Sequence, residues 1–104
     1  MPDTKTTSVA MTKPADERTA LTTDEKLVIL MEECAEVIKA ASKCSRFGWD
    51  REQPEYGQND KVLAAEIGDM LGMIDSLPLD WTQIEYFRKL KLEKAEKAKA
   101  MYGK

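Results

Sequence analysis

Four acidic residues occur in the sequence as two pairs with the same internal spacing. Glu33 and Glu36 stand three positions apart, and so do Glu66 and Asp69. Positions three apart project from the same side of a helix, so each pair presents two carboxylates together. Two facing helices of this kind gather four oxygen donors, the ligand type that a hard cation such as Mg²⁺ prefers. The spacing therefore makes these four residues candidates for a metal site.

The neighbours of the two pairs favour this interpretation. Acids on helix surfaces are commonly accompanied by Lys or Arg three or four positions away. Only Glu36 has such a partner, Lys39. Apolar residues flank both pairs, and carboxylates among apolar neighbours are costly unless a cation compensates them. The alternative is that both segments are ordinary amphipathic helices whose acids are solvated.

Length and composition limit the fold class. The 104 residues suffice for one domain, and 42% hydrophobic with 34% charged residues and few aromatics is typical of a small helical bundle. A core of this size is marginal by itself. We therefore expect an all-α fold, an antiparallel helical bundle completed by oligomerisation.

Several function classes are disfavoured. The net charge of −3 gives no general case for nucleic-acid or membrane binding. Histidine is absent, which removes Ser-His-Asp and Cys-His catalysis and the Glu-x-x-His pairs of di-iron bundles. There is neither a membrane-spanning apolar run nor the apolar stretch of a signal peptide. Cys34 and Cys44 are too far apart in one predicted helix for a disulfide, so we expect a reducing, cytoplasmic location.

The first predicted helix follows an arm without periodicity. Residues 1–21 are rich in polar residues and are expected to be disordered. Thr22 and Glu25 form a capping box that starts a helix, which should end near residues 46–48. We expect its apolar stripe to consist of Leu27, Leu30, Cys34, Val37, Ile38, Ala41 and Cys44.

The rest of the chain predicts a loop and two more helices, without a strand pattern. Residues 47–59 contain two glycines and a proline and are expected to be a loop. Asn59 or Asp60 should cap the second helix, and Asp80 with Gln83 the third. The second stripe should be Leu63, Ile67, Met70, Leu71, Ile74 and Leu77. The third helix should present Trp81, Ile84, Phe87 and Leu90 on its apolar face.

The two acidic motifs in their context resemble those of a known family. Glu32-Glu33-Cys34-Ala35-Glu36, followed on the next helix by Glu66-Ile67-Gly68-Asp69, is similar to the signature of the MazG-like all-α nucleoside triphosphate pyrophosphohydrolases. The likeness is strongest to small phage-type members, which implies the cytoplasm of a host cell if the chain is phage-encoded. It covers about residues 22–103, so we expect one domain of this type over residues 22–104.

The resemblance implies an activity and a ligand set. The activity is Mg²⁺-dependent hydrolysis of a nucleoside triphosphate to the monophosphate and pyrophosphate, with Mn²⁺ as a possible substitute, in a homo-oligomer that is a dimer or a tetramer. The metal ligands implied are Glu33, Glu36, Glu66 and Asp69. Glu32 is the candidate for orienting or deprotonating water, although its helical position points away from the Glu33 side and suits a solvated surface equally well. The 29 residues between Glu36 and Glu66 are long for the family. The sequence does not distinguish among standard nucleotides, damaged nucleotides and a guanosine alarmone as the substrate.

Substrate contacts are expected near the end of the first helix. Lys39, Lys43 and Arg46 are candidates for binding phosphates, although each also suits a solvated surface. Phe47, Trp49 and Tyr56 lie in or beside the loop, and Trp49 is the leading candidate for stacking on a base. Packing of these rings against the core is the alternative.

A second class of function also fits the pattern. A non-catalytic oligomeric helical module, such as a regulatory adaptor, would keep the apolar stripes. It would have no use for four carboxylates that lack cationic partners. A response to added divalent cation therefore separates the two classes.

Overall fold

The computed structural model describes residues 20–102, and side chains for residues 20–98. Three helices account for most of this part: α1 (Thr23–Phe47), α2 (Asn59–Asp75) and α3 (Trp81–Tyr102). Two short strands, β1 (Glu52–Gln53) and β2 (Gly57–Gln58), lie between α1 and α2. The expected predominance of helix is confirmed. Residues 1–19, most of the predicted disordered arm, lie outside the described residues.

Helix α1 begins and ends as its sequence predicts. The Thr22 hydroxyl accepts from the Glu25 amide at 3.1 Å, and the Thr22 amide donates to the Glu25 carboxylate at 2.9 Å. This capping box satisfies amides that have no partner inside the helix. At the other end Gly48 adopts a φ of 116°, which glycine tolerates, and its amide donates to the Cys44 carbonyl at 3.0 Å.

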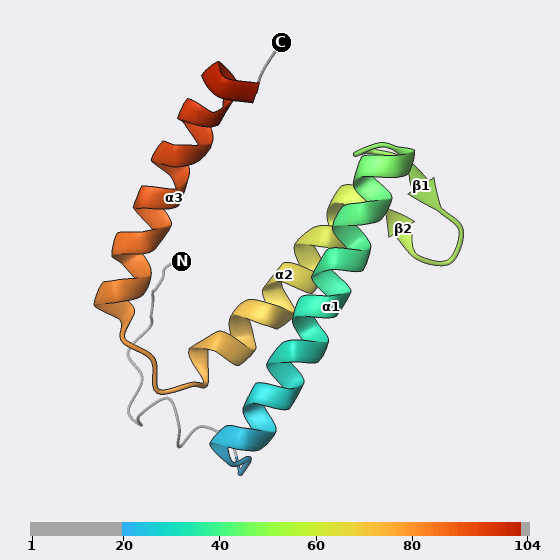
Figure 1. Cartoon of the computed structure of the whole chain (residues 1–104). Helices are drawn as coiled ribbons and strands as arrows, with labels where there is room; N and C mark the ends of the chain where they lie inside the picture. Colours follow the sequence, from blue (N-terminus) through green and yellow to red (C-terminus); the bar gives the residue numbers. More distant parts are fainter. Residues whose placement is uncertain (1–19, 103–104) are drawn as a thin grey trace.

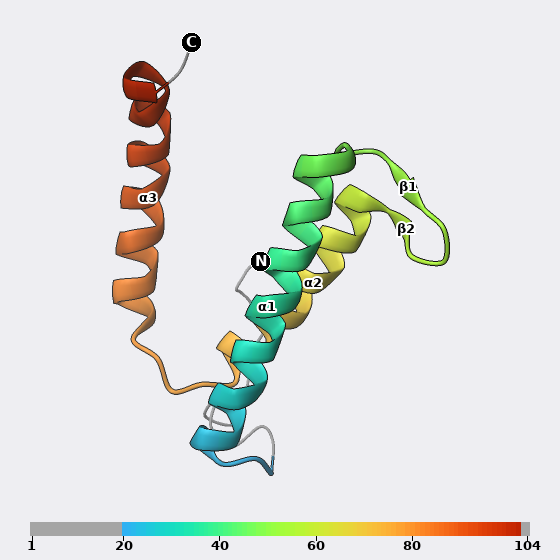
Figure 2. The same cartoon turned by 45° about the vertical axis from the view of Figure 1, so that its right-hand side comes forward.

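Helices α1 and α2 form an antiparallel pair, while α3 stands apart from them (Figure 1). The turned view in Figure 2 shows the same separation between α3 and the pair. The Cα radius of gyration is 16.2 Å, larger than the value of about 13 Å for a compact chain of about 100 residues. A single chain therefore forms a helical pair with an outlying third helix, rather than a closed bundle.

Two buried polar side chains lock the ends of the helical pair. Lys26 of α1 is 0% exposed, and its ammonium donates to the Ser76 carbonyl at the end of α2 at 2.9 Å. Asn59 at the start of α2 is 2% exposed, and its amide donates to the Gly48 carbonyl at 2.9 Å and the Lys43 carbonyl at 3.4 Å. Each bond joins one helix to the terminal region of the other. Together they fix the register in which α1 and α2 face each other.

The predicted loop over residues 47–59 contains a β-hairpin, so the expectation of no strand was wrong. Glu52 pairs with Gln58, and Gln53 with Gly57, in an antiparallel ladder. Pro54 and Glu55 form the turn, closed by the Tyr56 amide donating to the Gln53 carbonyl at 3.1 Å. Glu55 has a φ of 74° and Gly57 one of 95°. Strands of two residues are too short for an alternating pattern, which is why the sequence does not reveal them.

Backbone carbonyls cap α2, in place of the predicted side chain of Asn59 or Asp60. The helix starts at Asn59, and Gln58 precedes it without a side-chain capping bond. The amide of Asn59 donates to the Arg51 carbonyl, and the amide of Asp60 to the Trp49 carbonyl, each at 2.9 Å. Because the connection supplies these acceptors, the Asn59 side chain is available to bind the end of α1.

The predicted apolar stripe of α1 coincides only in part with the observed packing face, since Leu30, Cys34, Val37 and Cys44 are half-buried. Leu27, Ile38 and Ala41 belong to that stripe but are exposed, with Ile38 70% exposed, whereas Lys26 and Ala40 are buried. The stripe expected on α2 departs in the same way at one position, since Leu71 is exposed. The helical spacing of apolar residues could not reveal this partial difference, because the face that meets α2 also carries polar side chains such as Lys26.

Helix α3 starts at its predicted cap but leaves its apolar residues largely uncovered. The Gln83 amide donates to the Asp80 carboxylate at 3.2 Å, as the capping pattern indicates. Trp81 and Phe87 are exposed, while Ile84 and Leu90 are half-buried. Among the described side chains, Ala40 and Leu77 are the buried hydrophobic ones. No helix in the described part of the chain is long and apolar enough to cross a membrane.

We expect the buried ammonium of Lys26 to contribute measurably to stability. Lys26→Met keeps much of the side-chain length but leaves the Ser76 carbonyl without this donor. Hydrogen bonds to charged groups contribute about 1.5–3 kcal/mol, so chemical denaturation should show a loss of unfolding free energy of that order. Lys61→Met, an exposed position on α2, is the matched control and should change stability little. Equal stability of the two variants would contradict the role of Lys26.

Candidate metal centre

Three of the four predicted ligands converge between α1 and α2. Glu33 of α1 and Glu66 and Asp69 of α2 each offer a carboxylate oxygen, and these atoms all lie within 4.8 Å of one another. Glu33 and Glu66 are half-buried, and Asp69 is exposed. The antiparallel register set by Lys26 and Asn59 brings the two motifs level. We call these three residues the acidic triad.

The surroundings of Glu33 in the acidic triad disfavour the ionised form of its carboxyl group. The pKa of Glu33 is raised above its ordinary value by removal of its carboxylate from water. Repulsion from Asp69 and Glu66, and then from Glu36 and Glu32, raises it further. Each of these influences disfavours the ionised form of Glu33. A bound cation would remove the repulsion, because its charge is opposite to that of every member of the triad.

The donor atoms of the acidic triad are of the type that hard divalent cations such as Mg²⁺, Mn²⁺ and Ca²⁺ prefer. All three ligating groups are carboxylates, without a nitrogen or sulfur donor in the group. Oxygen-only sites suit Mg²⁺ and Mn²⁺, whereas Zn²⁺ sites generally include His or Cys. The residues present therefore fit the predicted Mg²⁺, with coordination left to be completed by water or substrate oxygens. Exposure of Asp69 leaves a direction from which such ligands can approach.

The two remaining predicted acids lie beside the triad. Glu36 is exposed and is not part of the converging group, but it lines a small cavity that Glu66 also lines. Glu32, predicted to orient water, is also exposed and lies outside the group. Its effect within the structure is electrostatic, since it adds to the repulsion that raises the pKa of Glu33. The ligand role of Glu36 and the water-orienting role of Glu32 stay predictions.

A cavity of about 80 Å³ adjoins the acidic triad where α1, α2 and the hairpin meet. Lys39 and Lys43, two of the predicted phosphate-binding residues, are among its lining residues. Two ammonium groups therefore share a cavity with Glu66, one of the acids of the triad. The complete lining is Glu36, Lys39, Ala40, Lys43, Gln53, Tyr56, Asn59, Val62 and Glu66.

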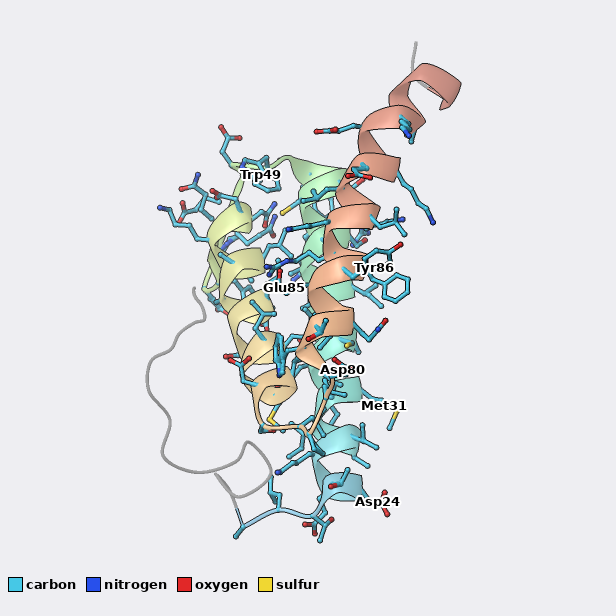
Figure 3. The ribbon with its side chains drawn as sticks, turned by 90° about the vertical axis from the view of Figure 1, so that its left-hand side faces the viewer. Asp24, Met31, Trp49, Asp80, Glu85 and Tyr86 are labelled. Carbon is cyan, nitrogen blue, oxygen red and sulfur yellow. The ribbon has the colours of Figure 1, made fainter. Side chains whose placement is uncertain are left out.

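The other two predicted substrate residues lie outside this lining. The Arg46 guanidinium lies over the Phe47 ring at 4.8 Å and donates to the Ser42 hydroxyl at 3.1 Å. Trp49 is 63% exposed and sits at the end of the helical pair (Figure 3). The structure thus separates these two residues from Lys39 and Lys43, and their substrate contacts stay predictions.

Sequence reasoning missed two polar lining residues, Gln53 and Asn59, and ranked Tyr56 below Trp49. The hairpin carries Gln53 and Tyr56 back over the end of α1, where the Lys43 ammonium lies 4.8 Å from the centre of the Tyr56 ring. The available signal was the run from Pro54 to Gly57, whose residue types are typical of a turn.

Comparison of the chain with known protein families, with curated proteins and with solved structures gave no match.

The raised pKa of Glu33 predicts how the metal-free protein responds to pH. Glu33 holds its proton more tightly when folded, so its contribution to stability is fully present below the ordinary glutamate pKa. That contribution is lost as pH rises through the raised pKa of the folded protein. Glu33→Gln should therefore raise the Tm of the metal-free protein at neutral pH and reduce the fall in Tm above the ordinary glutamate pKa.

Thermal melts in a chelator, at equal protein concentration, measure this effect. Glu93→Gln, an exposed position on α3, is the control and should give no rise in Tm. A Glu33→Gln variant that melts at or below the wild-type temperature at neutral pH would show that repulsion within the triad does not limit stability.

Proposed function

We propose that the chain is a metal-dependent nucleoside triphosphate pyrophosphohydrolase of the MazG-like all-α type. The observation that carries the proposal is the convergence of Glu33, Glu66 and Asp69 beside a cavity lined by Lys39 and Lys43. A triphosphate substrate brings several negative charges and oxygen ligands, so it needs both a divalent cation and protein cations. Both features are adjacent here, and the motifs that resemble the family supply the acids.

Each side chain has a definite task in this proposal. Glu33, Glu66 and Asp69 hold Mg²⁺, and Glu36, beside Glu66 at the cavity, is the fourth ligand. Bound Mg²⁺ would neutralise phosphate charge and lower the pKa of a coordinated water. Lys39 and Lys43 bind phosphate oxygens from the cavity side. Water attacks one phosphorus as its bond to the leaving pyrophosphate breaks, and the proton of the water passes to a carboxylate, for which Glu32 is the candidate.

The proposal includes assembly from more than one chain. The outward side of α1 exposes Met31, at 63%, and Ile38, at 70%, seven positions apart on the same side of the helix. Figure 3 shows Met31 projecting from α1 on the side away from α2. Trp81 and Phe87 of α3 are also exposed. We propose that a second copy covers these apolar residues, because burying them is favourable and one chain does not do so.

Asp69→Asn tests the acidic triad as a metal site. The substitution removes one charged ligand while preserving side-chain size, so pyrophosphate release from nucleoside triphosphates should be lost and the helical circular dichroism retained. Millimolar Mg²⁺ should raise the Tm of the wild type, since a ligand that binds the folded state stabilises it. The same addition should leave the Tm of Asp69→Asn nearly unchanged.

The control is Asp24→Asn in the exposed first turn of α1, which should behave as the wild type. Full activity of Asp69→Asn would show that the triad is not the metal site. A wild type that neither responds to Mg²⁺ or Mn²⁺ nor releases pyrophosphate from any nucleotide would favour the non-catalytic adaptor, which keeps the exposed apolar surface but has no use for the acids.

The assembly predicts a mass and a way to disrupt it. Light scattering at micromolar concentration should give at least twice the chain mass of 11.8 kDa. Met31→Glu combined with Ile38→Glu places two charges in the proposed contact and should lower the measured mass or the Tm at fixed concentration. Lys61→Glu on the exposed surface of α2 is the control. A stable, active monomer in the wild type would contradict the assembly.

A further inference from the structure

The cavity continues the acidic triad toward the hairpin. Glu66 belongs to the triad and also lines the cavity, so the two sites share a side chain. Along α1 the cavity residues follow Glu33 in order, ending at Lys43 about 15 Å further along the helix axis. Phosphates bound at the triad therefore leave room on the hairpin side for the nucleoside to which they are attached.

Tyr56 presents an aromatic ring at the far end of the cavity. Its side chain is 65% exposed, although it also lines the cavity, so the ring stands at the rim. The turn holds it there through the bond from its amide to the Gln53 carbonyl at 3.1 Å. Glu55, immediately before it, has a φ of 74°, a conformation that costs a non-glycine residue energy. The backbone thus fixes the ring over the cavity at some expense in stability.

We propose that the hairpin side of the cavity binds the nucleoside of the substrate, with the base stacked on the ring of Tyr56. The inference rests on the proposed function, because it gives a binding site to the nucleoside end of the same nucleotide, the end remote from the metal. Gln53 also lines this side and has an amide that can donate to and accept from the edge of a base.

The size of the cavity agrees with stacking at its rim. An enclosed cavity of about 150 Å³ holds benzene, so one of about 80 Å³ does not enclose a base. A flat ring at the mouth can hold a base without enclosing it, because stacking uses one face of each ring. Trp49 is exposed to a similar extent, at 63%, but does not line the cavity. Substitutions of Tyr56 and Trp49 therefore test whether a base needs a ring at the cavity rim or any exposed ring nearby.

Lys43 connects the two ends of the proposed subsite. Its ammonium lies 4.8 Å from the centre of the Tyr56 ring and the residue also lines the cavity. A base that stacks on this face takes the place of the ammonium. The released cation then lies within the same cavity as Lys39, where it can bind a phosphate oxygen. Binding of the base and binding of the phosphates are thereby linked through one side chain.

Calorimetry with α,β-imido nucleoside triphosphates, which are not cleaved between the first two phosphates, tests the proposal without turnover. In Mg²⁺, Tyr56→Ala should weaken binding about ten-fold or more, the range expected for one stacked base. Tyr56→Phe, which keeps the ring, should bind like the wild type. Trp49→Ala should do so too, because this proposal places the base on Tyr56 and so replaces the prediction that Trp49 stacks on it. Inorganic tripolyphosphate, which has no base, should bind Tyr56→Ala at least as tightly as the wild type, because Lys43 is then no longer held over the ring. Where pyrophosphate is released, Tyr56→Ala should raise KM by the same factor.

Several results would overturn this assignment. Unchanged affinity in Tyr56→Ala, or an equal loss in Trp49→Ala, places the base elsewhere. Equal weakening of the imido nucleotides and of tripolyphosphate shows that the ring does not contact the base, and a lowered Tm in Tyr56→Ala would identify a packing role as the cause. Failure of every imido nucleotide to bind the wild type also overturns it. Absence of pyrophosphate release with intact nucleotide binding would instead reject the proposed hydrolysis and leave the subsite standing.

Discussion

Glu33, Glu66 and Asp69 bring three negative charges together where α1 packs against α2. Repulsion of this kind tends to separate two helices, so other contacts must hold them in register. The buried bonds from Lys26 to Ser76 and from Asn59 to Gly48 do so at opposite ends of the pair. The acids are thus kept close by hydrogen bonds of Lys26 and Asn59, which lie outside the acidic triad.

The same constraint explains the distribution of apolar residues. A helix face that carries Glu33 toward its neighbour cannot also carry the whole apolar stripe, so part of that stripe turns outward. Ile38 is therefore exposed although its spacing is that of a core residue. Helix α3, which stands apart from the pair, likewise exposes apolar residues, namely Trp81 and Phe87. Within the helical pair, the bonds of Lys26 and Asn59 therefore decide which sides of α1 and α2 meet.

Local signals in the sequence were sufficient for the helix ends. The capping box of Thr22 and Glu25 and the positive φ of Gly48 depend on neighbouring residues alone, and Asp80 caps α3 for the same reason. The pairing of Glu33 with Glu66 and Asp69 was also predictable, because three-residue spacing fixes the side of a helix. Identical spacing in both motifs made the encounter of two acidic faces a natural expectation.

Contacts between distant segments were beyond these local rules. The start of α2 depends on the carbonyls of Trp49 and Arg51, which no pattern around Asn59 reveals. The burial of Lys26 depends on an acceptor 50 positions away, the Ser76 carbonyl. Tyr56 reaches the cavity only because the hairpin reverses the chain. Each of these features is decided by where the backbone turns, so residue types in one segment do not determine them.

The capping of α2 by the connection has a consequence for local unfolding. The first amides of α2, at Asn59 and Asp60, are protected by carbonyls of Arg51 and Trp49 rather than by a neighbouring side chain. Opening of the hairpin connection therefore exposes these amides to solvent exchange at the same moment. We therefore expect the amides of Asn59 and Asp60 to exchange together with the hairpin connection, and the amides of α3 to exchange independently of them.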